Sequence, residues 1–290
     1  MRGGRLKASG NTSVGGRVLY LIAAIFLSIV FVSPLVWAVL RSFQPESLIG
    51  QPISAANFNH FIIGNYTGLI GGRADIIRHV LNSLGVALGT ALLTAAIATL
   101  AGYAFGRPRL RYRGANVVFF FILVTLMIPF QAILTPIFLE LHALGLTNRL
   151  IGLVLFYTTY NLPFGVFVMR NTFSHIPQEM EDSAAVDGAG VMRTLVSVLR
   201  PLVVPGMATT LLYAFLFAWT EFLAALIFIT SNSKLTLPVA LLNLEAGTFG
   251  AVNFGYLIAG AVIAMIPCVV LYIALQRYYI QGLMSGAVKG

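Results

Sequence analysis

The sequence has few charged residues and almost no cysteine. Only 9% of its 290 residues are charged and 58% are hydrophobic, whereas about a quarter of the residues of a soluble domain are charged. This balance excludes an ordinary water-soluble globular fold. The one cysteine, Cys268, excludes an intramolecular disulfide framework and a metal site built from several cysteines.

Lysine is also scarce, and its positions bear on enzyme class. None of Lys7, Lys234 and Lys289 follows a glycine, as the lysine of a nucleotide-binding P-loop does, so we expect no ATPase motor in this chain. The sequence also lacks a nucleophile elbow, an HExxH motif and paired carboxylates in helical register. We therefore expect a chain that is not an enzyme and that itself binds neither a cofactor nor a metal.

Six long apolar runs dominate the sequence. Each has about 20 residues or more, enough for a helix to cross the hydrocarbon core of a bilayer. We predict an all-α integral membrane protein with six transmembrane helices. The first run follows a basic segment, as in a signal peptide, but it is too long for a cleavable core and we expect it to be retained. The runs cover residues 18–40, 80–105, 115–139, 150–169, 202–230 and 256–275.

The basic residues predict the orientation of the chain. Six spans place both termini on one side, and with the termini inside, 13 of the 18 Lys and Arg residues lie in inner segments. The positive-inside rule therefore predicts a multi-pass membrane protein with both termini in the cytoplasm; the resemblance described below implies that the membrane is the bacterial cytoplasmic membrane. The same loops explain the net charge of +9 without a nucleic-acid partner.

We divide the chain into three parts. Residues 1–79 comprise a cytoplasmic tail, the first span and a long external loop whose composition is compatible with short amphipathic helices. Residues 80–277 form the transmembrane core, with an inner loop at 171–201, and residues 278–290 form a cytoplasmic tail. The sequence has no internal repeat strong enough to suggest an inverted-repeat transporter built within this one chain.

The inner loop has the local signals of two short helices and a joint. Ser174 is expected to cap a helix whose first turn contains Pro177, with acidic residues near its positive end. Gly188 permits a tight left-handed turn, and a second helix is expected to begin near Gly190. The small residues around this joint would form a surface for close docking of another protein.

The same segment resembles the EAA loop of permease subunits of bacterial ATP-binding-cassette (ABC) importers. Residues 182–189 end in the sequence Asp-Gly-Ala, and Pro201 and Pro205 follow. This version is similar to that of carbohydrate-uptake permeases, such as the smaller permease of the maltose importer. The sequence departs from the pattern at Asp182, Ser183 and Arg200, where Glu, Ala and an apolar residue are usual. Further matching segments lie at 82–83, 101–104, 219–222, 235–238, 276–278, 281–283 and 286–290.

The resemblance implies a type I ABC importer permease fold with cytoplasmic coupling helices. It further implies the import of a mono- or oligosaccharide by alternating access, coupled to a separate ATPase. The implied partners are a second permease subunit, two ATPase subunits that use ATP and Mg, and an external solute-binding protein. By the same resemblance, these residues couple to the ATPase: Glu179, Glu181, Asp182, Ser183, Ala184, Ala185, Asp187, Gly188, Ala189 and Gly190.

Polar residues within the spans are candidates for a substrate path. Glu221 is the one acidic residue of the six runs, and an ionisable group at membrane depth indicates a functional site. The alternative is that it fixes helix packing by a hydrogen bond. The fourth run carries a belt of polar and aromatic residues at 157–161. This belt likewise has two interpretations, contact with sugar and hydrogen bonding between helices. The path candidates are Tyr157, Tyr160, Asn161, Trp219 and Glu221.

Two alternative functions remain at this stage. An importer of another solute, such as a phosphorylated polyol or an amino acid, would use the same machinery, but the carboxy-terminal ending favours the carbohydrate branch. An ATP-independent secondary transporter would normally contain more membrane charge and an internal repeat.

Overall fold

The apolar runs form helices, as expected for segments whose backbone amides and carbonyls meet no water in a bilayer. The computed structural model describes residues 14–52, 60–72, 75–107, 112–246 and 252–287, and within these ranges every regular element is a helix. The predicted all-α class is confirmed. Five helices are long and apolar enough to cross a membrane, and a bent pair makes a sixth crossing if it counts as one span.

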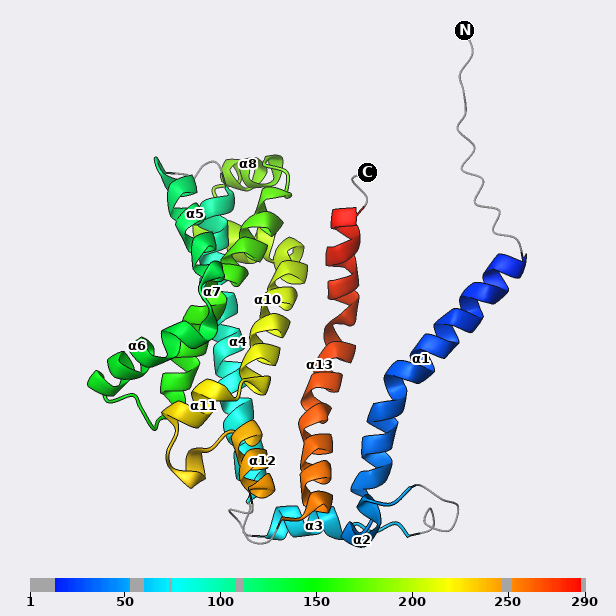
Figure 1. Ribbon diagram of the computed structural model, residues 1–290. Helices are drawn as coiled ribbons and strands as arrows, with labels where there is room; N and C mark the ends of the chain where they lie inside the picture. The colour runs from blue at the N-terminus through cyan, green and yellow to red at the C-terminus, as the bar shows by residue number, and fades with distance from the viewer. Residues whose placement is uncertain (1–13, 53–59, 73–74, 108–111, 247–251, 288–290) are drawn as a thin grey trace.

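Four long helices stand side by side in the bundle (Figure 1): α4 (Ile76–Gly106), α7 (Leu150–Ser174), α10 (Arg200–Thr220) and α13 (Phe254–Ala287). Glycines on α4 bring its backbone close to α7. A Cβ atom at Gly102 would lie 2.4 Å from Cβ of Met169, and one at Gly106 would lie 2.9 Å from the carbonyl oxygen of Arg170. The two helices are therefore in close contact at the ends where both finish.

The first helix, α1 (Val14–Ser42), leans away from this bundle. None of its most apolar window is buried, and it approaches α13 at the end where the short helices α2 (Glu46–Ile49) and α3 (Gly64–Gly71) lie (Figure 1). There the side chain of Asn65 donates hydrogen bonds to the carbonyls of Ser42 and Gln44, at 2.8 and 2.9 Å. The expected short helices in this loop are thus present, and they hold one end of α1.

The third apolar run is not the continuous helix that we predicted. It forms α5 (Ala115–Val124), the 3-10 turn η2 (Thr125–Met127) and α6 (Phe130–Ala143), with a bend of 103° between the two parts. The cause is Pro129, which has no N–H to donate and which disfavours helical backbone at the preceding residue. Ile128 accordingly has extended backbone, with ψ of 120°.

The fifth run is also interrupted. α10 ends at Thr220, Glu221 is extended, and α11 (Leu223–Phe228) starts a new direction. The prediction of one span to residue 230 is therefore wrong. The short helices η4 (Asn232–Lys234) and α12 (Leu237–Glu245) complete this part of the chain.

The inner loop forms a small bent unit at the end of the bundle opposite α3 (Figure 1). It consists of α8 (Glu179–Val186), α9 (Val191–Arg193) and the π-helical segment η3 (Thr194–Leu199). The prediction that Ser174 caps α8 is wrong. α7 continues to Ser174 because Phe173 in its last turn is fully buried, and the Ser174 hydroxyl donates to the carbonyl of Asn171.

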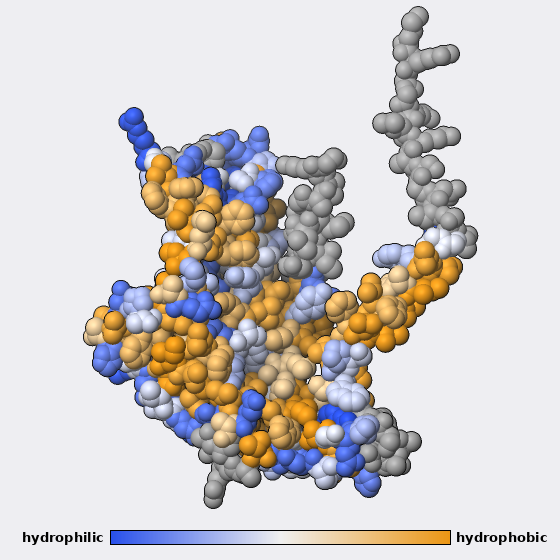
Figure 2. All heavy atoms as spheres, in the orientation of Figure 1, coloured by the Kyte–Doolittle hydropathy of each residue, from blue (hydrophilic) through white to orange (hydrophobic). Residues whose placement is uncertain are grey.

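Surface hydropathy separates the middle of the molecule from its two ends. Hydrophilic residues gather over α8 at one end and over α2 and α3 at the other, with a broad hydrophobic area between them (Figure 2). A bilayer would cover this hydrophobic area, since exposed apolar surface of such extent is costly in water. The α8 unit therefore lies outside the membrane, on the side opposite α3.

Candidate functional site

The joint after α8 has the geometry of a Schellman motif. Gly188 has a φ of +73°, in the left-handed region, as the sequence predicted. Its N–H donates to the carbonyl of Ala185 at 3.0 Å, and the N–H of Ala189 donates to Ala184 at 2.9 Å. These two bonds close the carboxyl end of α8 and set the direction in which the chain leaves it.

The outer face of α8 and its joint present small and acidic residues to solvent. Ala184 and Glu181 are buried beneath this face, and Asp182 and Ala189 are partly buried. A shallow groove of about 350 Å³ runs along α8 between Glu179 and Val198. The larger side chains of Met180 and Val186 are also exposed on α8, so a docking protein would meet apolar groups beside the small and acidic ones. The exposed residues among the predicted coupling set are Glu179, Ser183, Ala185, Asp187, Gly188 and Gly190.

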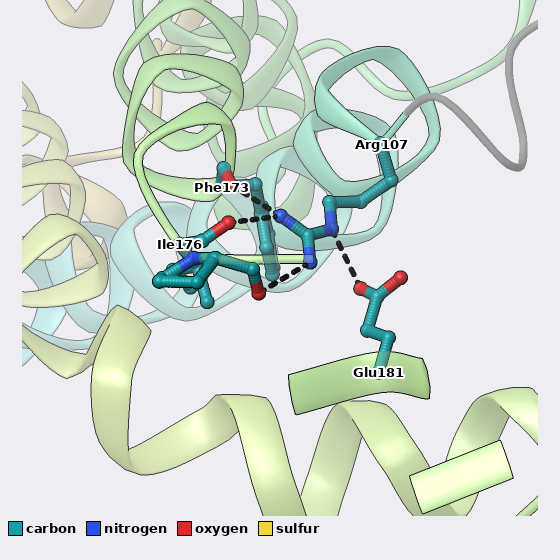
Figure 3. A network of polar contacts seen from close by, with 5 residues as sticks. Arg107, Phe173, Ile176 and Glu181 are labelled. Atoms are coloured by element: carbon teal, nitrogen blue, oxygen red, sulfur yellow. Dashed lines mark hydrogen bonds and ion pairs between the residues drawn. The ribbon is translucent and has the colours of Figure 1, made fainter. Parts of the chain in front are cut away.

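Glu181 differs from the other predicted coupling residues because its side chain points into the molecule. Its carboxylate pairs with Arg107, whose Nε donates to Oε1 of Glu181 at 2.6 Å (Figure 3). The side chains are only 2% and 5% exposed. In this arrangement the Glu181 carboxylate lies beneath the exposed face of α8, where Arg107 holds it.

Arg107 also binds the chain that leads into α8. Its Nη1 donates to the carbonyls of Phe173 and Ile176, at 2.9 and 2.7 Å, and Nη2 reaches the carbonyl of Pro177 at 3.4 Å (Figure 3). The guanidinium thus binds carbonyls in the last turn of α7 and in the short segment that leads from it into α8. In the sequence Arg107 is one of several inner basic residues, and nothing there distinguishes it from the arginines that follow it.

Glu221 caps the start of α11. Its carboxylate accepts hydrogen bonds from the N–H groups of Ala224, at 3.0 and 3.1 Å, and of Ala225, at 3.3 Å. The hydroxyl of Tyr157 on α7 donates to the same carboxylate. The negative charge therefore faces the positive end of a helix and a hydrogen-bond donor from a neighbouring helix. This geometry favours the packing interpretation of Glu221.

The other path candidates are mostly enclosed within the chain. Tyr157, Asn161 and Trp219 are at most 3% exposed. Asn161 donates to the carbonyl of Tyr157 at 2.7 Å, and the Trp219 indole donates to the carbonyl of Ala264 at 3.0 Å. These three side chains therefore line no open path in this conformation.

Tyr160 differs from them because it is only partly buried. Its ring stacks against Phe217 of α10, with 5.1 Å between ring centroids. Tyr160 and Glu221 are thus the two path candidates with some accessible surface. In the part of the chain that the structure describes, no group of three or more His, Cys, Asp or Glu residues is placed to hold a metal ion.

Known proteins are similar to this chain in sequence. The family described as "Binding-protein-dependent transport system inner membrane component" matches residues 98–284. The trehalose transport system permease protein SugB of Mycobacterium tuberculosis is 33% identical over 261 residues, which cover 89% of this chain and 92% of that protein. The trehalose/maltose transport system permease protein MalG of Thermococcus litoralis is 29% identical over 276 residues, or 94% and 97% of the two chains.

A solved structure is also similar. It is the crystal structure of a bacterial ABC transporter involved in the import of the acidic polysaccharide alginate, one chain of which matches with a TM-score of 0.76. The match covers 92% of this chain and 98% of that chain at 22% sequence identity. At this identity the likeness concerns the fold.

Proposed function

This chain belongs to the family of binding-protein-dependent transport system inner membrane components, and on that premise we propose that it is the permease subunit of an ATP-driven importer of sugars. The observation that carries the proposal is the α8 unit, which presents an exposed small-residue face outside the membrane-covered area. The substrate class is supported by SugB and MalG, whose names specify trehalose and maltose transport and which align over most of this chain.

The proposed mechanism is alternating access driven from the cytoplasm. A separate ATPase subunit docks on the exposed face of α8 and its joint, and ATP-dependent closure of two such subunits moves this unit. The movement exchanges an inward-open for an outward-open path between this chain and a second permease subunit. An external solute-binding protein delivers the sugar, and ATP and Mg are used by the ATPase subunits. This chain itself carries out no covalent chemistry.

The proposed orientation places α8 and both termini in the cytoplasm of a bacterial cell, and cysteine labelling tests it. Single cysteines replace Tyr112, at the α8 end, and Ser233, at the opposite end, in a Cys268→Ser background. Both positions are exposed. We expect a membrane-impermeant maleimide to label position 233 in intact cells and position 112 only after the cells are opened. The reverse pattern contradicts the proposed orientation.

The proposed function is tested by purifying the tagged chain from its native membrane in mild detergent. We expect an ATPase, a second permease subunit and a solute-binding protein to be identified by mass spectrometry in the same complex. The solute-binding protein then allows sugars to be screened by thermal shift, and the reconstituted complex should import the sugar that binds, only with ATP. A chain that purifies alone and transports without ATP would instead be a secondary transporter.

A further inference from the structure

We propose that Arg107 is a positioning residue that fastens the coupling helix α8 to α4 and α7, so that movement of the ATPase enters the membrane first through these two helices. The inference rests on the proposed function, because it assigns a route to the movement that the ATPase produces. Arg107 belongs neither to the exposed face of α8 nor to the candidates for the substrate path.

The side chain of Arg107 connects three helical elements. Arg107 directly follows α4, and its own N–H closes that helix by donating to the carbonyl of Tyr103 at 3.1 Å. Its guanidinium binds the carbonyl of Phe173 in the last turn of α7, the carbonyl of Ile176 just after that helix, and the Glu181 carboxylate of α8. A planar group with fixed donor directions restrains all three elements at once, which a flexible ammonium cannot do.

The two helices that Arg107 joins, α4 and α7, are tightly packed against each other. The Gly102 and Gly106 contacts leave no room for a side chain between α4 and α7. Gly165 of α7 similarly faces α4, where an added Cβ would lie 2.9 Å from Cβ of Ala98. A displacement of α8 that is passed to the end of either helix is therefore passed to both.

The segment that connects α8 to α10 contains irregular helical structure. It runs through Gly188, the three-residue helix α9 and the π-helical segment η3. Pro201 then lacks the N–H that would bond the carbonyl of Ser197 in a regular helix. Irregular helical hydrogen bonding of this sort commonly marks a hinge. α8 is thus fastened to α4 and α7 through Arg107, whereas on the α10 side it packs against η3, where the helical hydrogen bonding is irregular.

Spin labels test whether α8 and α4 move as one body. In a Cys268→Ser background, one pair of labels joins Leu100 of α4 to Met180 of α8, and a second pair joins Met180 to Leu202 of α10. All three side chains are exposed. In the assembled complex, we expect the distance between Leu100 and Met180 to be the same with and without trapped ATP, and the distance between Met180 and Leu202 to change.

Substitutions then show whether Arg107 is responsible. Glu181→Gln keeps the shape of the side chain and removes the charge, and Arg107→Lys keeps the charge and removes the planar fork. For both, we expect the distribution of distances between Leu100 and Met180 to broaden, with Arg107→Lys less affected than Arg107→Met. With trehalose or maltose as substrate, sugar imported per ATP hydrolysed should fall about tenfold, the size of a typical coupling between two sites.

The exposed ion pair Arg78–Asp75 provides the matched control. Its charged atoms are 3.5 Å apart and its side chains are 56% and 57% exposed, so Arg78→Gln should leave distances and transport ratio unchanged. The proposal is overturned if ATP changes the distance between Leu100 and Met180 while Arg107 and Glu181 are intact. It is also overturned if Glu181→Gln and Arg107→Lys lower the yield of complex but change neither the distance distribution nor the sugar imported per ATP hydrolysed. If ATP changes neither distance, the proposed ATP-driven function fails instead.

Discussion

Replacing Gly188 with valine is expected to abolish sugar uptake while the chain still inserts into the membrane. Gly188 has a φ of +73°, where an L-residue loses about 1–2 kcal/mol and a β-branched residue more. No atom lies within 4 Å of a Cβ atom built at this position, so the effect comes from the backbone and not from a clash. Valine relieves the strain by moving φ to negative values.

That change of φ breaks the two hydrogen bonds that end α8. The N–H groups of Gly188 and Ala189 leave the carbonyls of Ala185 and Ala184, and α9 departs in another direction. The exposed docking face is then no longer assembled. Uptake by the reconstituted complex and the amount of inserted chain are the two measurements. Gly188→Asn should retain uptake, because asparagine tolerates the left-handed region.

Gly145 offers a matched control for this prediction. Its φ is +66°, its Cβ position is equally open, and it lies between α6 and α7 at the end away from α8. Gly145→Val therefore introduces the same kind of strain outside the coupling loop and should preserve uptake. Normal uptake in Gly188→Val, or equal losses in both variants, would show that the α8 joint has no special role.

The sequence predicts the fold well where composition decides it. Apolar runs of sufficient length indicate helices because a bilayer leaves the backbone no other partner, and these helices are present. The breaks at Pro129 and Glu221 were missed for different reasons. A proline can also be accommodated within a span, as Pro163 and Pro205 are here. α10 ends just before Glu221, whose side chain caps the start of α11, and hydropathy does not register such a cap.

Some features of the candidate site could likewise be predicted from the sequence, and others could not. The left-handed joint at Gly188 follows from local chemistry and was predicted. The ion pair between Arg107 and Glu181 joins residues 74 positions apart, and only the packing of α4 against α7 brings them together. The burial of Tyr157, Asn161 and Trp219 depends on which face of each helix meets its neighbours. A sequence without periodic polarity does not specify that rotation.

Replacing Glu221 with alanine is expected to cause the second large loss, because it removes the carboxylate that accepts hydrogen bonds from three donors. The N–H groups of Ala224 and Ala225 lose their partner, as does the fully buried hydroxyl of Tyr157. Each buried donor left unsatisfied costs about 1–3 kcal/mol. The free energy of unfolding and the yield of assembled complex should both fall, and uptake with them. Glu245→Ala, at an exposed position at the end of α12, should change neither.

A double-mutant cycle separates packing from a role in the substrate path. Tyr157→Phe removes the hydroxyl and Glu221→Gln the charge, and the double variant shows whether their effects on stability are coupled. If Glu221 fixes packing, the two effects are not additive, and uptake per assembled complex stays normal in Tyr157→Phe. If stability is unaffected in Glu221→Gln while the Michaelis constant for sugar rises, the carboxylate contacts the substrate, and the packing interpretation has to be abandoned.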